Sequence, residues 1–358
     1  MNYENNVFVY LKWRKDLSFI DSPFNEVDAL ILSELAYIYL DGIVPGVEED
    51  GAITIREANK AYTKTSAKIL NYSGKEELFD LLADSPRFAD VFICNYVNKV
   101  DATLQQQFAA MHFIIMPNVT YVAFRGTDNT IVGWREDFNM SYMMPVPAQQ
   151  TAVDYVNATL KGMFHRYYLG GHSKGGNLAI YSGVFCNPRI QKKLIQVYSF
   201  DGPGFNRKMV DDDAYIAVRK KIHAFIPEAS IVGLLMEHEE DYTIVKSSGN
   251  GMMQHEGLTW QVEGTKFLQA EELDKNSKDI SARIAEWLAK VSHQERKQIV
   301  DSFFNIFERA GFVVFDDVFE MDAKKAGVLL KAVATVPKEE RELVGKLVKL
   351  FIEVNTKK

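Results

Sequence analysis

Hydrophobic residues recur at two different spacings along this chain, and the spacing changes near residue 104. Residues 24 to 42 carry apolar side chains three and four positions apart, which predicts an amphipathic helix, although Glu34 falls on its apolar face. Residues 55 to 99 continue at helical spacing, with breaks near 71 to 74 and at Pro86. The first part of the chain is therefore predicted to be mainly helical.

Beyond residue 104 the pattern favours strands that alternate with helices. "QQFAAMHFIIM" and "VTYVAFRGT" are β-rich runs on either side of Pro117-Asn118, which predicts a hairpin. Strands and helices then alternate, which predicts a mostly parallel sheet covered on both faces. The predicted order is a helix at 151–164, a strand at 166–170, a helix at 174–186, a strand at 194–200, and strands at "KIHAFI" and "YTIVKS".

From about residue 268 the sequence becomes helical again and highly charged. We therefore expect an α/β fold in three parts. Residues 1–103 form a mainly helical segment that packs on the core, residues 104–267 form the α/β core, and residues 268–358 form a helical C-terminal segment. No repeat or low-complexity tract interrupts this order.

Composition excludes several classes of protein. The net charge of −7 argues against an extended nucleic-acid surface, which needs clustered positive charge. The first residues lack the basic start and apolar run of a signal peptide, so we expect none. No stretch approaches eighteen uncharged apolar residues, so we expect no membrane-spanning helix. The two cysteines, Cys94 and Cys186, lack the CxxC spacing of a zinc or redox site and suggest reduced thiols. We expect a cytoplasmic protein without a metal or cofactor.

The most informative run is "GGHSKGG", which contains the pattern G-x-S-x-G at residues 171–175. A serine in a tight turn between a buried strand and a helix exposes its hydroxyl, and small flanking residues prevent clashes there. The free amides of the helix N-terminus also point at any oxyanion formed beside the serine. Two other interpretations are a glycine-rich connection without chemistry and a phosphate-binding loop. The second is disfavoured because neither common phosphate motif is present.

Flanking motifs extend this pattern. "AFRGT" ends the strand before the turn, Trp134 and Asp137 follow as W-x-x-D, and "SFDGPGF" ends the next strand. Together these segments resemble the class 3 lipase branch of the α/β-hydrolase fold, over about residues 104 to 265. The opening "WRKDLSFIDSPFNEVDALILSELAY" and the segment "QHEGLTWQV" resemble a poorly characterised bacterial family of lipase-like hydrolases. The resemblance implies an α/β-hydrolase fold, a nucleophile at Ser173 and a carboxylic ester as substrate.

A serine nucleophile needs a histidine to accept its proton and a carboxylate to orient that histidine. In the fold that the chain resembles the histidine comes last, and His255 lies in a glycine-bearing loop after "YTIVKS". A structural histidine is the alternative. Ser230 stands where class 3 lipases carry the acid. Asp201 at the end of the strand after the turn is the favoured substitute, with Glu228 as the alternative.

The oxyanion hole would use the backbone of Lys174, which follows the nucleophile, and, by the resemblance, Thr127 of "FRGT". Trp134 belongs either to a lid, as the position does in the lipases, or to packing under a loop. The methionine-rich loop at 140–150 either closes over an acyl chain or packs on the core.

Two functions remain open at this point. The first is a serine hydrolase that cleaves a carboxylic ester, with a lipid as one candidate substrate. The second is a non-catalytic binding or regulatory module on the same scaffold, motivated by Ser230 and the large helical additions. Residues 324–358, with nine Lys and Arg against four Glu, favour a helix packed on its own domain over one lying on an acidic membrane.

Overall fold

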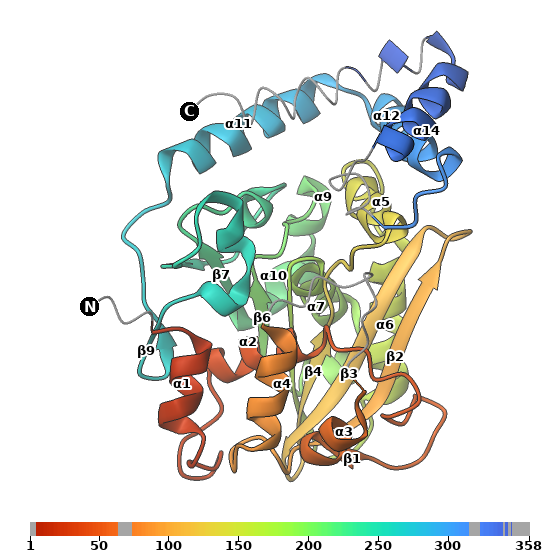
Figure 1. Ribbon diagram of the computed structural model, residues 1–358. Coiled ribbons are helices and arrows are strands. Elements are labelled where there is room, and N and C mark those ends of the chain that lie inside the picture. Colours follow the sequence, from red (N-terminus) through yellow and green to blue (C-terminus); the bar gives the residue numbers. More distant parts are fainter. Residues whose placement is uncertain (1–4, 64–73, 315–322, 339–340, 343–344, 346–358) are drawn as a thin grey trace.

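A central sheet of eight strands in sequential order organises the molecule (Figure 1). The computed structural model describes residues 5–63, 74–314, 323–338, 341–342 and 345. The strands are β1 (Ile53–Thr54), β2 (Phe92–Asp101), β3 (Gln106–Met116), β4 (Val119–Phe124), β5 (Arg166–His172), β6 (Leu194–Phe200), β7 (Ile222–Pro227) and β8 (Tyr242–Val245). A separate pair, β9 (Val262–Glu263) and β10 (Lys266–Phe267), forms a small antiparallel sheet.

The sheet changes direction at β4. Strands β1 to β4 pair antiparallel, and the hairpin predicted around Pro117-Asn118 joins β3 to β4, with Met116 opposite Val119. From β4 to β8 every pair is parallel, and helices connect most of these strands. This is the α/β-hydrolase fold that the sequence predicts, and the predicted strand 194–200 is confirmed as β6.

The helical prediction for residues 92 to 99 is wrong, because these residues form β2. Its exposed and buried side chains do not alternate regularly, since the pairing with β3 shifts register between Cys94 and Val97. A bulge of this kind interrupts the alternation by which a strand is recognised in a sequence. The strand is fixed instead by its long pairing with β3.

Helices cover both faces of the sheet. On β4, Tyr121 and Ala123 point to one face, and Val122 and Phe124 point to the other. The first face packs against α1 (Val7–Arg14), α2 (Glu26–Leu35), α3 (Ile55–Ala61) and α4 (Lys75–Ala83). The second packs against α6 (Pro147–Thr159), α7 (Lys174–Phe185), α8 (Pro188–Gln191), α9 (Arg207–Val210) and α10 (Asp213–Val218).

Helix α2 lies at the centre of the first face and is shorter than the predicted 24–42. Asn25 and Asp28 form a capping box that starts it, and the helix ends at Leu35. A buried ion pair ties α2 to the segment before β2, since Nη2 of Arg87 lies 2.5 Å from Oδ2 of Asp28. The N-terminal residues are thus packed directly on the sheet.

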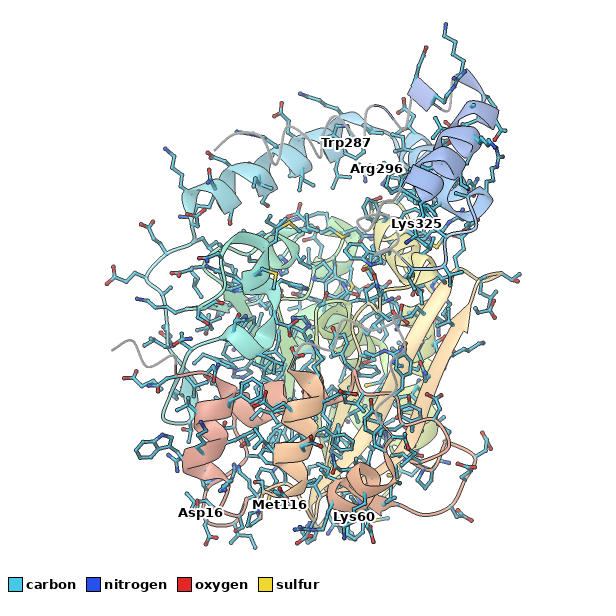
Figure 2. All side chains as sticks on the ribbon, in the orientation of Figure 1. Asp16, Lys60, Met116, Trp287, Arg296 and Lys325 are labelled. Carbon is cyan, nitrogen blue, oxygen red and sulfur yellow. The ribbon has the colours of Figure 1, made fainter. Side chains whose placement is uncertain are left out.

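The last helices lie at the end of the molecule that also carries α5 (Ile131–Asn139) (Figure 1). They are α11 (Lys275–Lys290), α12 (His293–Arg309) and α14 (Ala323–Thr335). Figure 2 labels Trp287 on α11, Arg296 on α12 and Lys325 on α14. Arg135 of α5 fixes α12 through 2.7 Å contacts with both Asp301 and Glu308.

No helix within the described ranges is sufficiently long and apolar to cross a bilayer. Much of the basic tail at 324–358 lies outside the described residues, and its packing on its own domain stays a prediction. The two cysteines are unpaired, with Cys186 buried and Cys94 partly so.

Candidate active site

Ser173 occupies the turn between β5 and α7. Its backbone has φ of 57° and ψ of −132°, a conformation that costs a non-glycine residue about 1–3 kcal/mol. Two hydrogen bonds hold the turn, from Ser173 N to Phe200 O at 2.8 Å and from Gly176 N to Ser173 O at 2.9 Å. The serine side chain does not cap α7, so its hydroxyl is not committed to the helix.

The glycines around this serine are required by close backbone contacts. A Cβ on Gly175 would lie 2.1 Å from the carbonyl oxygen of Phe124, at the end of β4. A Cβ on Gly171 would lie 2.4 Å from the carbonyl carbon of Gly175. Strand, turn and helix can therefore approach this closely only without side chains, which accounts for the G-x-S-x-G pattern.

Asp201 and His255 are joined by a hydrogen bond of 2.6 Å between Oδ2 and Nδ1. Asp201 follows β6 and is fully buried, whereas the His255 side chain is 29% exposed, in the 3-10 turn Gly251–His255. A carboxylate only accepts hydrogen bonds, so Nδ1 of the neutral imidazole carries the proton. Nε2 is left with its lone pair, as a general base requires.

Ser230 completes the environment of Asp201. Its hydroxyl donates to Oδ1 of Asp201 at 2.5 Å, and the amide of Gly233 donates to the same oxygen at 3.1 Å. A Cβ on Gly233 would lie 2.2 Å from that oxygen, so this approach also requires glycine. The residue at the expected acid position thus contacts the favoured substitute.

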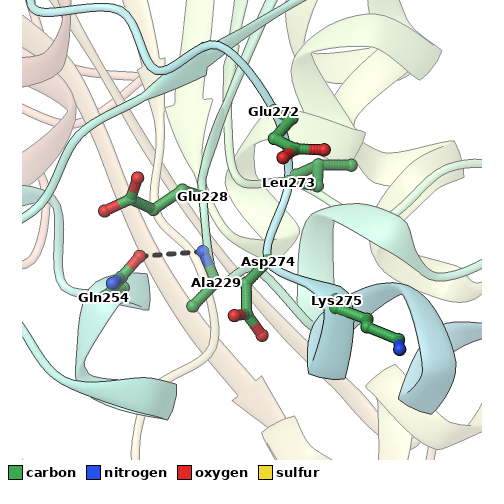
Figure 3. A pocket seen from close by; sticks show the side chains of 7 residues that line it. All are labelled: Glu228, Ala229, Gln254, Glu272, Leu273, Asp274 and Lys275. Atoms are coloured by element: carbon green, nitrogen blue, oxygen red, sulfur yellow. Dashed lines mark hydrogen bonds between the residues drawn. The ribbon is translucent and has the colours of Figure 1, made fainter.

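Glu228, the alternative acid, lies at a cavity and not in the contact between Asp201 and His255. Its carboxylate makes no hydrogen bond with His255 among the described residues, and Glu228 lines a cavity of about 280 Å³ (Figure 3). The cavity also borders the start of α11 at Asp274 and Lys275. Gln254, next to His255, accepts a hydrogen bond of 2.9 Å from the amide of Ala229 there.

His172, the residue before Ser173, packs against His255. The rings of His172 and His255 lie 4.6 Å apart between centroids, at an angle of 39°. No hydrogen bond joins the Ser173 hydroxyl to His255 in the part of the chain that the structure describes. Catalytic hydrogen bonds are often long or poorly aligned without substrate and tighten in the substrate complex, so the absence of this bond does not argue against proton transfer.

Thr127, which follows β4, is hydrogen-bonded to Asp137 of α5. The hydroxyl of Thr127 donates to Oδ2 of Asp137 at 2.5 Å. Burial raises the pKa of Asp137 to about 6, although Lys174 and the bond from Thr127 act to lower it. This contact fixes the threonine after the "FRG" strand end relative to α5.

The side chain of Lys174 points away from the oxyanion position that its backbone was predicted to serve. It is buried, and Nζ lies 3.1 Å from Oε2 of Glu136 and 3.6 Å from Oδ1 of Asp137. Burial lowers the pKa of Lys174, but the two carboxylates raise it by more. The backbone amide at the first position of α7 has no acceptor within the helix.

Trp134 and part of residues 140–150 contact the C-terminal helices. Trp134 joins an aromatic cluster between α5 and α12 that includes Phe138 and Phe304. Met140 and Val146 are buried, while Met143 is 37% exposed. Ser141 accepts a hydrogen bond of 2.5 Å from Arg296 of α12. Both segments therefore contact the C-terminal helices.

A buried group of charges beside His255 was not predicted. Nζ of Lys75 lies 2.8 Å from Oε1 of Glu256 and 3.1 Å from Oε2 of Glu34. Lys75 and Glu34 are both almost fully buried. The one signal in the sequence was Glu34 on the apolar face of its helix, because a carboxylate there needs a buried partner.

These charges act on the imidazole of His255. Burial lowers the pKa of His255, but the hydrogen bond with Asp201 and the charges of Asp201, Glu256 and Glu34 raise it above its ordinary value overall. Within the described residues, no group of three His, Cys, Asp or Glu side chains is arranged to hold a metal ion. The site thus combines an imidazole stabilised by neighbouring charges with a partly exposed serine in the turn before α7.

Comparison with known proteins gave one family model and several solved structures. A family model described as Mbeg1-like matches residues 82–305. The M37 lipase structure is 15% identical, with 57% of this chain and 67% of that chain covered and a TM-score of 0.35. The native propeptide complex of Rhizomucor miehei lipase is also 15% identical, with 61% and 66% covered and a TM-score of 0.39. No curated protein matches the chain.

Proposed function

The chain belongs to the Mbeg1-like family, and we propose that it is a serine hydrolase that cleaves a carboxylic ester through an acyl-enzyme on Ser173. In this proposal Ser173 is the nucleophile, His255 the general base and Asp201 the orienting acid. Lipid esters are the substrate class that we favour, because the fold is lipase-like. Activity is a property of the site and not of the fold, so the proposal depends on these side chains.

Acylation follows from the tautomer of His255. Nε2 takes the proton from the Ser173 hydroxyl as the oxygen attacks the carbonyl carbon of the ester. The carbonyl oxygen becomes an oxyanion, which the amides of Lys174 and Thr127 would stabilise. The tetrahedral intermediate then collapses, and the leaving alcohol takes the proton from Nε2, which leaves an acyl group on Ser173.

Deacylation repeats these steps with water. Nε2 accepts a proton from the water as its oxygen attacks the acyl carbon, and the protonated His255 returns that proton to Ser173 as the acid leaves. Each step creates a positive imidazolium for a short time. The buried charge of Asp201, supported by Glu256 and Glu34, stabilises that cation.

The observation that carries the proposal is the 2.6 Å bond between Asp201 and His255, beside a serine held in a strained, glycine-lined turn. A fluorophosphonate probe followed by mass spectrometry tests it. We expect the label on Ser173 in the wild type and none in Ser173→Ala. A folded wild type that neither takes the label nor hydrolyses p-nitrophenyl esters of any chain length would reject the proposal.

The second candidate is a binding or regulatory module on the same scaffold. The observation that favours it is the missing hydrogen bond between Ser173 and His255 among the described residues. In that case esters would bind without turnover, and Ser173→Ala would bind them as well as the wild type. Labelling of Ser173 by the probe decides against this candidate, because only an activated serine reacts with it.

A further inference from the structure

We propose that His172, the residue before the nucleophile, is a positioning residue for His255 and is itself held by Tyr37 and Lys75 of the N-terminal helical layer. The proposal rests on the hydrolase function given above. It assigns to Glu34, Tyr37 and Lys75 a part in the active site. These residues precede the segment 82–305 that matches the family model.

The two histidines are in direct contact. Nε2 of His172 lies 2.6 Å from the backbone carbonyl oxygen of His255. A carbonyl oxygen only accepts, so Nε2 of His172 carries the proton and donates it. His172 therefore holds the backbone of the base, while Asp201 holds its ring.

Nδ1 of His172 has a separate partner, the hydroxyl of Tyr37. With the proton on Nε2, Nδ1 of the neutral ring has a lone pair, and the hydroxyl of Tyr37 lies 3.0 Å from it. Tyr37 therefore donates to Nδ1 and fixes the tautomer that faces His255. Burial and the nearby His255 lower the pKa of His172 to about 3, so the ring stays neutral in the working range.

The neutral state of His172 matters for catalysis. Its ring is 4.6 Å from the ring of His255, which becomes positive in every step of the reaction. A second positive imidazole at that distance would oppose this charge. The neutral ring instead offers a donor to the backbone without adding charge.

Lys75 contacts the segment that carries His255. Its ammonium group pairs with Glu256, the residue after His255, and lies 4.7 Å from the centre of the Tyr37 ring. Lys75 also pairs with Glu34, whose Oε1 is 3.7 Å from Nδ1 of His172. Glu34 of α2 and Lys75 of α4 thereby hold two parts of the site. These are the segment of His255 and Glu256, and the tyrosine that orients His172.

The test compares Tyr37→Phe with Tyr62→Phe in the full chain. Each change removes one hydroxyl from a half-buried tyrosine of the N-terminal layer, and the Tyr62 hydroxyl donates to Glu76 and not to His172. Loss of the Tyr37 donor permits the other tautomer of His172 and frees the loop of His255. We expect kcat in Tyr37→Phe to fall roughly 10- to 100-fold with KM retained, as for small misplacements of a catalytic group. Tyr62→Phe should match the wild type.

A spectroscopic measurement separates this proposal from the proposed function. ¹⁵N spectra of histidine-labelled wild type, assigned with His172→Gln, report the tautomer of His172 without any turnover. A neutral Nε2–H ring supports the positioning role, and an Nδ1–H or protonated ring overturns it. Unchanged kcat and labelling rate in Tyr37→Phe also overturn it. A wild type that is inert to esters and to the probe rejects the hydrolase function, while the spectra still decide the positioning.

Discussion

The hydroxyl of Ser230 donates a hydrogen bond of 2.5 Å to Oδ1 of Asp201. The other oxygen of this carboxylate accepts from Nδ1 of His255 at 2.6 Å. The position at which class 3 lipases carry the acid, Ser230, thus lies in direct contact with Asp201, the substitute that the sequence favours. The serine leaves room for one buried carboxylate, whereas an aspartate at 230 would bring two like charges together.

Asp201→Asn tests which residue orients His255. An amide favours the wrong imidazole tautomer and cannot stabilise the imidazolium, so we expect kcat to fall by about four orders of magnitude with the fold preserved. Glu228→Gln is the matched control and should retain wild-type turnover, because Glu228 makes no hydrogen bond with His255 among the described residues. Steady-state kinetics on one ester measures both variants. Near-normal turnover in Asp201→Asn together with loss in Glu228→Gln would reverse the assignment.

The pH dependence of kcat/KM reports the charges around His255. The base must be neutral, so activity is lost as the pH falls through its pKa, and this pKa lies above the ordinary value of about 6.5. The charge of Glu256 is one of the causes that raise it. Glu256→Gln removes that charge and should move the acid limb of the profile to lower pH.

Glu263→Gln is the control for this shift, since Glu263 is an exposed carboxylate on β9. We expect its profile to match that of the wild type. An acid limb that stays in place in Glu256→Gln, or that moves equally in both variants, would contradict the electrostatic origin of the raised pKa.

The sequence predicted those parts of the site that depend on local geometry. The turn at Ser173 and the β3–β4 hairpin follow from short motifs whose glycines, proline and asparagine act on their immediate neighbours. The contacts of Lys75 with Glu34 and Glu256 could not be predicted in this way. Lys75 is more than forty positions from Glu34 and more than a hundred from Glu256. Only the packing of α2 and α4 on the sheet brings these residues together.

Strand β2 shows a second reason why part of the fold could not be predicted from the sequence. Its residues pair with β3 on one side and with β1 on the other, and the bulge between Cys94 and Val97 breaks the alternation. Local propensity therefore competes with pairing that the sequence pattern does not display. The pairing of Glu136 could not be predicted either, because its buried carboxylate contacts Lys174 on another helix.

Arg87→Met should reduce the stability of the whole molecule. Arg87 and Asp28 are both fully buried side chains, and Arg87 also donates to the backbone carbonyls of Leu17 and Ser22. Removing the guanidinium leaves the buried carboxylate of Asp28 without a positive partner. Such a loss typically lowers the free energy of unfolding by about 3–5 kcal/mol. Urea unfolding measures the change in the free energy of unfolding.

Arg56→Met provides the comparison for this loss. Arg56 pairs with Asp90 on the surface, where the two side chains are 41% and 81% exposed. Exposed pairs contribute about 0–1 kcal/mol, so this variant should unfold at nearly the wild-type urea concentration. Equal losses in the two variants would mean that the buried pair does not anchor the N-terminal layer.

A double-mutant cycle on Thr127 and Asp137 distinguishes two roles for the threonine. Its hydroxyl has a single proton, which is donated to Asp137 at 2.5 Å, so the donor left for an oxyanion is the amide of Thr127. If the hydroxyl only orients this residue, Thr127→Val and Asp137→Asn each disturb the same contact. We then expect each to lower kcat/KM by roughly tenfold and the double variant to be no worse than either single one.

A loss of about 10²–10³ in Thr127→Val with little effect of Asp137→Asn would instead make the hydroxyl an oxyanion donor. Additive losses would mean that the two side chains act separately, in which case Asp137 serves Lys174, which lies 3.6 Å away, and not Thr127.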